Sequence, residues 1–88
     1  MSLDLDTLKV TQCYPSYIFE EFSEALGQIL YPIGLADNGH TAIVKDEENK
    51  IYAIDGCLLF YIADTLDEAK EILSRDKWLE FKRVVEID

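Results

Sequence analysis

Three turn signals divide the middle of the sequence into short apolar runs, and their spacing constrains the fold more than any other feature. Asn38-Gly39 and Asp55-Gly56 favour tight β-hairpins because both residue types tolerate positive φ, and a polar stretch at 46–49 lies between them. The intervening runs have lengths typical of strands and comprise residues 29–35, 41–45, 50–54 and 57–63. The sequence therefore predicts an antiparallel meander.

The runs of this meander differ in their expected positions. Pro32 cannot donate a hydrogen bond to a neighbouring strand, so residues 29–35 are expected near an edge of the sheet or at a β-bulge. Residues 57–63 are all apolar, which favours a central strand buried on both faces. The alternating residues 78–88 favour a further strand, and residues 8–12 alternate in the same way. We therefore expect four to six strands in one sheet.

Two amphipathic helices are predicted beside the sheet. Residues 16–30 carry apolar side chains at helical spacing, and Ser16 stands where a side chain caps the first free amides. Gly27 weakens the last turn, so an end of the helix at Gly27 is an alternative. A second helix opens at Thr65, which together with Glu68 matches a capping box. We expect both helices to pack on one face of the sheet. The predicted fold class is therefore α+β, an antiparallel meander with two helices on one face.

The charge balance excludes several classes of function. The chain of 88 residues is long enough for one domain, and 18 acidic against eight basic residues give it a net charge of −10. Nucleic acids and anionic membranes require cationic side chains, so neither is an expected partner. No apolar run approaches the ~18 residues of a membrane-spanning helix. The acidic first residues do not resemble a secretory signal, so we expect a cytoplasmic protein with reduced cysteines.

Candidate catalytic and metal-binding residues are few. His40 is the only histidine, and a hydrolase with Cys57 as nucleophile and Asp55 as the orienting residue is one alternative. No spacing marks these three residues as a set, so we favour a solvated His40 beside the first turn. Residues 46–57 do not match a calcium-binding loop, because Ile51 occupies the glycine position. We expect no enzymatic activity, no cofactor and no metal.

Acidic residues gather in one part of the sequence. Lys and Arg are absent from Val10 to Val44, and the predicted helix 16–30 has a purely acidic outer face. Either this face only solvates the protein, or it binds a basic partner protein with the help of exposed tyrosines. The candidate partner-binding residues are Glu20, Glu21, Glu24, Asp37, Asp46, Glu47, Glu48, Tyr52 and Tyr61.

Several short segments resemble a known protein family. They are Tyr31-Pro32-Ile33-Gly34, Asp37-Asn38-Gly39, Thr41-Ala42-Ile43-Val44-Lys45-Asp46, Lys50-Ile51-Tyr52 and Thr65-Leu66-Asp67-Glu68-Ala69. This stretch, about residues 29–74, resembles the C-terminal half of the SUKH superfamily, in particular its bacterial immunity proteins that are encoded beside polymorphic secreted toxins. The part of the chain before Tyr31 is shorter than the family pattern, and we expect residues 1–88 to form a single domain of this kind.

The resemblance implies a binding protein without catalytic residues. It implies that the chain binds and neutralises a toxin, which in this family is often a nuclease or a deaminase. A toxin that grips nucleic acid has a basic surface, which an acidic protein complements. We therefore expect a cytoplasmic immunity protein, or antitoxin, that binds a basic toxin. The alternatives are a small regulatory scaffold that acts as a homodimer through an edge strand, and the hydrolase described above.

Overall fold

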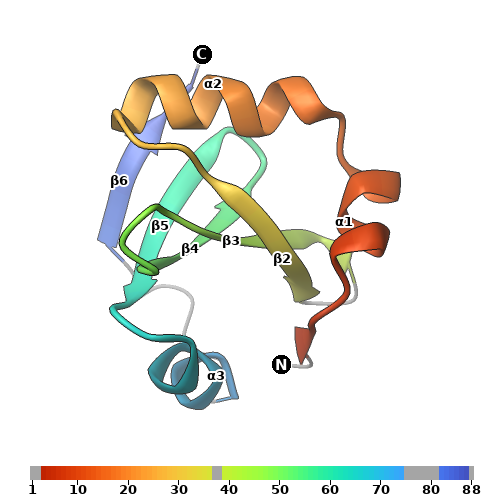
Figure 1. Ribbon diagram of the computed structural model, residues 1–88, viewed down its shortest axis with the longest axis vertical. Helices are drawn as coiled ribbons and strands as arrows, with labels where there is room; N and C mark the ends of the chain where they lie inside the picture. The colour runs from red at the N-terminus through yellow and green to blue at the C-terminus, as the bar shows by residue number, and fades with distance from the viewer. Residues whose placement is uncertain (1–2, 37–38, 75–81, 88) are drawn as a thin grey trace.

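The described part of the chain forms one six-stranded antiparallel sheet with three helices. The structure, a computed structural model, describes residues 3–36, 39–74 and 82–87. The elements in chain order are β1 (Leu3–Asp4), α1 (Thr7–Cys13), α2 (Ser16–Leu26), β2 (Tyr31–Ala36), β3 (Thr41–Lys45), β4 (Ile51–Asp55), β5 (Leu58–Ala63), α3 (Leu66–Ser74) and β6 (Lys82–Glu86). The strands lie side by side in the order of the chain (Figure 1). The predicted α+β class and the antiparallel meander are confirmed.

The order of the strands corrects one prediction and confirms two others. Residues 57–63 were expected to form a central strand, but β5 is fifth of six strands and the central pair is β3 and β4. Four strands lie on one side of β5 and only β6 lies on the other, and the pairing of β6 with β5 also confirms the strand expected in the tail. Pairing of β2 with β3 shifts between Pro32 and Gly34, which confirms the predicted bulge.

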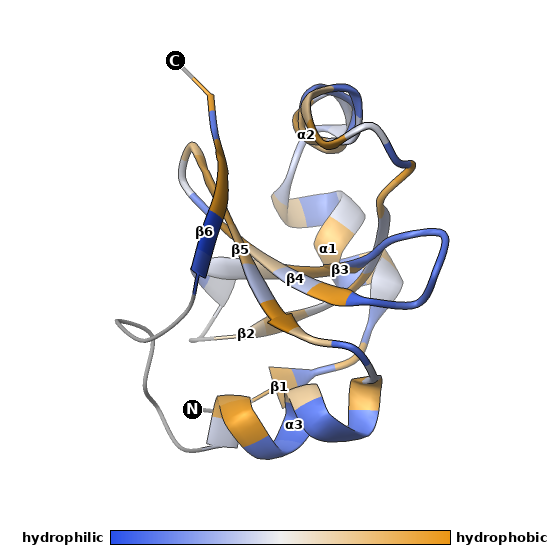
Figure 2. Cartoon of the chain, turned by 90° about the vertical axis from the view of Figure 1, so that its left-hand side faces the viewer, coloured by the Kyte–Doolittle hydropathy of each residue, from blue (hydrophilic) through white to orange (hydrophobic). Residues whose placement is uncertain are grey.

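The helices cover both faces of the sheet, so the prediction that two helices share one face was wrong. Strands β3 and β4 are buried on both sides, and their side chains alternate between two core clusters. Figures 1 and 2 show α2 on one side of the sheet and α3 on the other. The cluster on the α2 side includes Val10, Phe19, Phe22, Val44, Tyr52 and Ile54. The cluster on the α3 side includes Ile43, Ile51, Ala53, Ile62, Ala69 and Leu73.

The N-terminal region is helical where the sequence predicted a strand at residues 8–12. The side chain of Asp6 accepts hydrogen bonds from the backbone amides of Leu8 and Lys9, which caps the start of α1. Val10 is the buried residue of this helix and packs in the core cluster on the α2 side. The capping Asp6 therefore indicated the structure of this region better than the alternation of apolar and polar side chains over residues 8–12.

Helix α2 ends at the earlier of the two predicted positions and has a different cap. Pro15 is the N-cap residue and no side chain caps the first amides, so the expected role of Ser16 was wrong. The helix ends at Leu26 because Gly27 adopts a left-handed conformation with φ of 83°. The structure thus confirms the alternative end at Gly27 and not the longer helix to residue 30. Ile29 therefore lies beyond the helix and is 54% exposed instead of packing in the helical stripe.

Gly34 allows the edge strand β1 to pack closely against β2. A Cβ atom at this position would lie 2.5 Å from the backbone oxygen of Asp4. No side chain fits there without moving the backbone of β1. The glycine of the Tyr31–Gly34 segment thus has a packing role.

The junction from β5 to α3 carries half of the predicted capping box. The backbone amide of Glu68 donates to the Thr65 hydroxyl at 3.2 Å.

Among the described residues, none of the three helices is long and apolar enough to cross a membrane. Two predicted segments lie partly outside the described residues: Asn38 of the predicted Asn38-Gly39 turn, and residues 78–81 of the predicted strand 78–88.

Candidate functional site

The residues considered for catalysis do not form a connected site. His40, Asp55 and Cys57 are all exposed, and Cys57 is a free thiol, as is Cys13. The hydrogen bonds found among the described residues include none between the side chains of His40, Asp55 and Cys57. Within residues 3–36, 39–74 and 82–87, no three His, Cys, Asp or Glu side chains come together in a way that would hold a metal ion.

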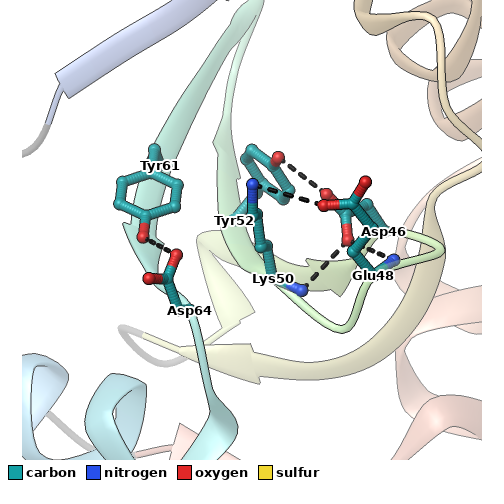
Figure 3. A network of polar contacts seen from close by, with 6 residues as sticks. All are labelled: Asp46, Glu48, Lys50, Tyr52, Tyr61 and Asp64. Atoms are coloured by element: carbon teal, nitrogen blue, oxygen red, sulfur yellow. Dashed lines mark hydrogen bonds and ion pairs between the residues drawn. The ribbon is translucent and has the colours of Figure 1, made fainter.

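The turn between β3 and β4 is organised by a buried carboxylate. Asp46 is 1% exposed, and its Oδ1 atom accepts hydrogen bonds from the backbone amides of Glu48, at 2.8 Å, and Lys50, at 3.0 Å. Its Oδ2 atom accepts a bond of 2.9 Å from the hydroxyl of Tyr52 (Figure 3). These three donors replace the water that the carboxylate loses on burial.

This network removes two candidate residues from the surface. Asp46 was predicted to contact a partner, and Tyr52 was predicted to do so if it is exposed. Both are buried and are bonded to each other, so neither presents an exposed side chain to a partner. Burial, followed by the hydrogen bond to Asp46, raises the pKa of the Tyr52 phenol well above its ordinary value. Both residues stabilise the hairpin. The side chain of Asp46 is short enough to bond backbone amides of its own turn, and Tyr52 donates to the second oxygen of Asp46.

Tyr61 is half-buried beside this network. Its ring packs edge to face on Tyr52, with centroids 5.9 Å apart, and its hydroxyl donates to Asp64. That hydrogen bond, with a smaller contribution from desolvation, raises the pKa of Tyr61 to about 12. Part of the Tyr61 side chain remains accessible, so it stays a candidate contact residue.

The other two carboxylates of the turn face solvent. Glu47 is exposed and accepts a hydrogen bond of 3.0 Å from the backbone amide of Ile29. Glu48 is exposed and lies 3.3 Å from the ammonium of Lys50. The bond from Ile29 ties the hairpin to the segment that follows α2.

Helix α2 presents the predicted acidic face to solvent. Glu20, Glu21 and Glu24 are all exposed, and none forms an ion pair with a Lys or Arg of the described residues. Tyr17 precedes these glutamates by three, four and seven positions, so it shares their side of the helix, and it is 58% exposed. Asp37 lies outside the described residues.

Two shallow hollows join this helix face to carboxylates from elsewhere in the chain. Glu24 and Glu47 line one of about 310 Å³, together with Gln28 and Ile29. Glu21 and Glu24 line another of about 440 Å³, into which β6 brings its own carboxylate. We call the exposed carboxylates gathered here the acidic surface: Glu20, Glu21, Glu24, Glu47 and Glu86.

Sequence reasoning missed the apolar residues of this surface. Tyr17 and Ile29 are exposed beside the carboxylates, whereas the anchors predicted from the sequence were Tyr52 and Tyr61. Helical spacing from Glu20, Glu21 and Glu24 was a signal that placed Tyr17 on the acidic side. For Ile29 the signal was Gly27, because the exposure of Ile29 depends on α2 ending there.

The comparison with protein families identifies the chain. The model of the SUKH-3 immunity protein family matches residues 2–76, which is most of the chain and includes the N-terminal helices. The chain belongs to the SUKH-3 immunity protein family. The resemblance described above is thereby confirmed and extends beyond residues 29–74. No curated protein and no solved structure was found to match the chain.

Within this SUKH-3 domain, the segments that carried the resemblance have structural roles. Gly34 permits the close approach of β1, and the aspartate and tyrosine of the hairpin segments bond each other as Asp46 and Tyr52. Thr65 caps α3. The recognisable pattern therefore specifies the scaffold. The carboxylates of the acidic surface lie mainly on α2, which is outside that pattern.

Proposed function

We propose that this SUKH-3 protein is a non-enzymatic, cytoplasmic immunity protein that binds a basic toxin through its acidic surface and thereby neutralises it. The observation that carries this proposal is that the exposed carboxylates of α2 are joined by carboxylates from two other elements. Glu47 of the β3–β4 turn shares one hollow with Glu24 and the exposed Ile29, and Glu86 of β6 shares another with Glu21 and Glu24. A toxin of the nuclease or deaminase type fits, because such an enzyme holds a nucleic-acid substrate with cationic side chains.

The charges support fast and selective binding more than they support affinity. A single exposed ion pair is worth about 0–1 kcal/mol, so no one glutamate would dominate the complex. Several like charges on one face attract a basic partner over a longer range and accelerate association, an effect that salt screens. Covering the cationic substrate channel of the toxin would then exclude nucleic acid from it.

Affinity requires apolar anchors, and Tyr17 and Ile29 are suitably placed. Both are more than half exposed. Ile29 lines the hollow that holds Glu24 and Glu47, and Tyr17 lies on the glutamate side of α2 by helical spacing. Aromatic residues in the centre of an interface often contribute about 2 kcal/mol or more when truncated to alanine. Tyr61, Glu48 and Asp37 stay secondary candidates for contacts at the rim.

The direct test measures association with the cognate toxin domain, which for this family is sought beside the immunity gene. We expect the triple variant Glu20→Gln, Glu21→Gln, Glu24→Gln to associate about ten-fold more slowly than the unaltered protein at low salt. At high salt the two rates should converge. Tyr17→Ala should instead raise the dissociation rate.

A matched variant separates local from total charge. Asp67→Asn, Glu68→Gln, Glu71→Gln makes the same change in net charge on α3, across the sheet from α2. This control should retain most of the association rate. Equal slowing by both triple variants would mean that only the net charge matters, and salt-independent rates in all three proteins would contradict binding through the acidic surface.

A homodimer is a second proposal for the assembly of the protein. β6 is an outer strand of the sheet, and Val84 in its centre is 37% exposed. Antiparallel pairing of two β6 strands about Val84 would place Lys82 opposite Glu86 of the second copy. Sedimentation should show a dimer that Val84→Lys dissociates. A 10.1 kDa species alone at micromolar concentration would refute the dimer.

A further inference from the structure

A pocket of about 450 Å³ lies on the α3 side of the sheet, where β1, the β3–β4 turn and the start of α3 meet. Its apolar side chains belong to Leu5, Ile33, Ile51 and Leu66. Its polar side chains belong to Lys45, Asn49, Asp64 and Thr65. This volume, and an apolar lining combined with polar groups at defined positions, are typical of sites for small molecules.

The bulge in β2 helps to form the pocket. Pro32 pairs with Val44 and Gly34 pairs with Ile43, so Ile33 is the extra residue and has no partner across the strand pair. A bulge turns a side chain out of the regular alternation of its strand. Ile33 lines the pocket beside Ile51, which is 1% exposed, and Leu5, which is 43% exposed. The apolar lining therefore runs from the core to the surface.

The pocket contains a cation that lacks an ionic partner. Lys45 follows Ile43 by two residues in β3, so it projects on the α3 side of the sheet. The described residues form ion pairs at Lys9, Lys50 and Arg83, and none at Lys45. In a protein with a net charge of −10, an ammonium left without a carboxylate beside an apolar cavity favours an anionic ligand.

Asp64 sets a limit on where an anion can lie. It also lines the pocket, and its Oδ1 atom accepts the hydrogen bond from the Tyr61 hydroxyl. Asp64 and Lys45 do not form an ion pair within 4.0 Å, so the two charges stand apart. The carboxylate of a ligand would therefore bind at the Lys45 end of the pocket, and repulsion by Asp64 would weaken its binding.

We propose that this pocket binds a small amphipathic carboxylate, with an aliphatic chain along Leu5, Ile33, Ile51 and Leu66 and its carboxylate on the ammonium of Lys45. This site is separate from the acidic surface, and the proposal does not depend on toxin binding. It adds a ligand class to a protein whose expected partner is another protein.

The first test is a titration of the purified protein with hexanoate, octanoate and decanoate, followed by NMR or calorimetry. The dissociation constant should fall about four-fold for each added CH₂ until the pocket is filled. Octanol and octylamine, which have the same chain, should bind about ten-fold more weakly than octanoate because they lose the charge-assisted bond to Lys45.

Single substitutions locate the site. Lys45→Gln should abolish the preference for octanoate over octanol while keeping the dependence on chain length. Asp64→Asn should tighten octanoate binding several-fold, because it removes a repelling charge. Leu5→Gln should weaken all the ligands. The matched control is Leu8→Gln, since Leu8 is 66% exposed on α1 and does not line the pocket. Urea unfolding of each variant confirms that it is folded.

Three results would overturn the proposal. These are the absence of saturable octanoate binding, an equal or greater affinity for octylamine, and binding that Leu5→Gln and Leu8→Gln weaken equally. A dimer that Leu5→Gln dissociates would assign the pocket to a second copy of the chain and would overturn it as well.

Discussion

The glutamates of α2 and Asp46 of the β3–β4 turn look alike in the sequence and have opposite surroundings in the structure. Glu20, Glu21 and Glu24 are exposed and form no ion pair with a described cation. Asp46 is buried and accepts three hydrogen bonds from its own hairpin. One group is available to a partner, while the other stabilises the fold.

The difference arises from side-chain length and from the neighbours that each element supplies. Asp46 is short enough to reach the amides of Glu48 and Lys50, and β4 places the Tyr52 hydroxyl over its second oxygen. A helical glutamate has no free amides beside it, because the helix uses them. A carboxylate is therefore recruited for structure where unpaired donors surround it, and elsewhere it remains in water.

The sharpest test of this contrast is Asp46→Ala. It would leave two backbone amides and a buried hydroxyl without an acceptor, so we expect the free energy of unfolding to fall by about 3 kcal/mol. Glu48→Ala in the same turn removes only an exposed ion pair and should cost less than about 1 kcal/mol. Urea denaturation of the three proteins measures both values, and equal losses would contradict a special role for Asp46.

Tyr52→Phe should have the next largest effect. It removes one donor to Asp46, so we expect a loss of about 1–2 kcal/mol at neutral pH. Because the folded-state pKa of Tyr52 is raised, its contribution is present below about pH 10 and is lost as the pH rises through that raised pKa.

The pH dependence supplies the check on this second prediction. The unfolded chain releases the Tyr52 proton first, so the stability gap between the unaltered protein and Tyr52→Phe should shrink between pH 7 and about pH 11. Tyr61 is present in both proteins and cancels in the difference. A gap that widens with pH would show that the phenol does not donate to Asp46.

Of the three predicted changes in stability, the smallest is expected when the charges of α2 are removed. Glu20 and Glu24 are four residues apart and repel each other. The free energy of unfolding of the triple glutamine variant should therefore equal that of the unaltered protein or exceed it by a few tenths of a kcal/mol. Thermal denaturation measures this change. A loss above about 1 kcal/mol would mean that these glutamates stabilise the fold, as Asp46 does.

The turns and strands of the meander were predictable because their signals are local. Each hairpin is specified by a few residues with turn preferences between apolar runs, and β3, β4 and β5 lie within one or two residues of their predicted bounds. Helix α1 was missed because a five-residue alternation was preferred to the capping signal of Asp6. Both helices were predicted on one face, although the expected burial of residues 57–63 on both faces already required cover on both sides of the sheet.

The sequence by itself determined the α+β meander, the sign of the charge and the SUKH resemblance, since these depend on composition and on residues near one another in the chain. Only the tertiary structure decided which carboxylates are buried and which gather on the acidic surface. Glu47 meets Ile29 from 18 positions away, and Glu86 reaches α2 from the end of the chain. Burial and convergence depend on contacts between distant segments, and those contacts exist only once the sheet has formed.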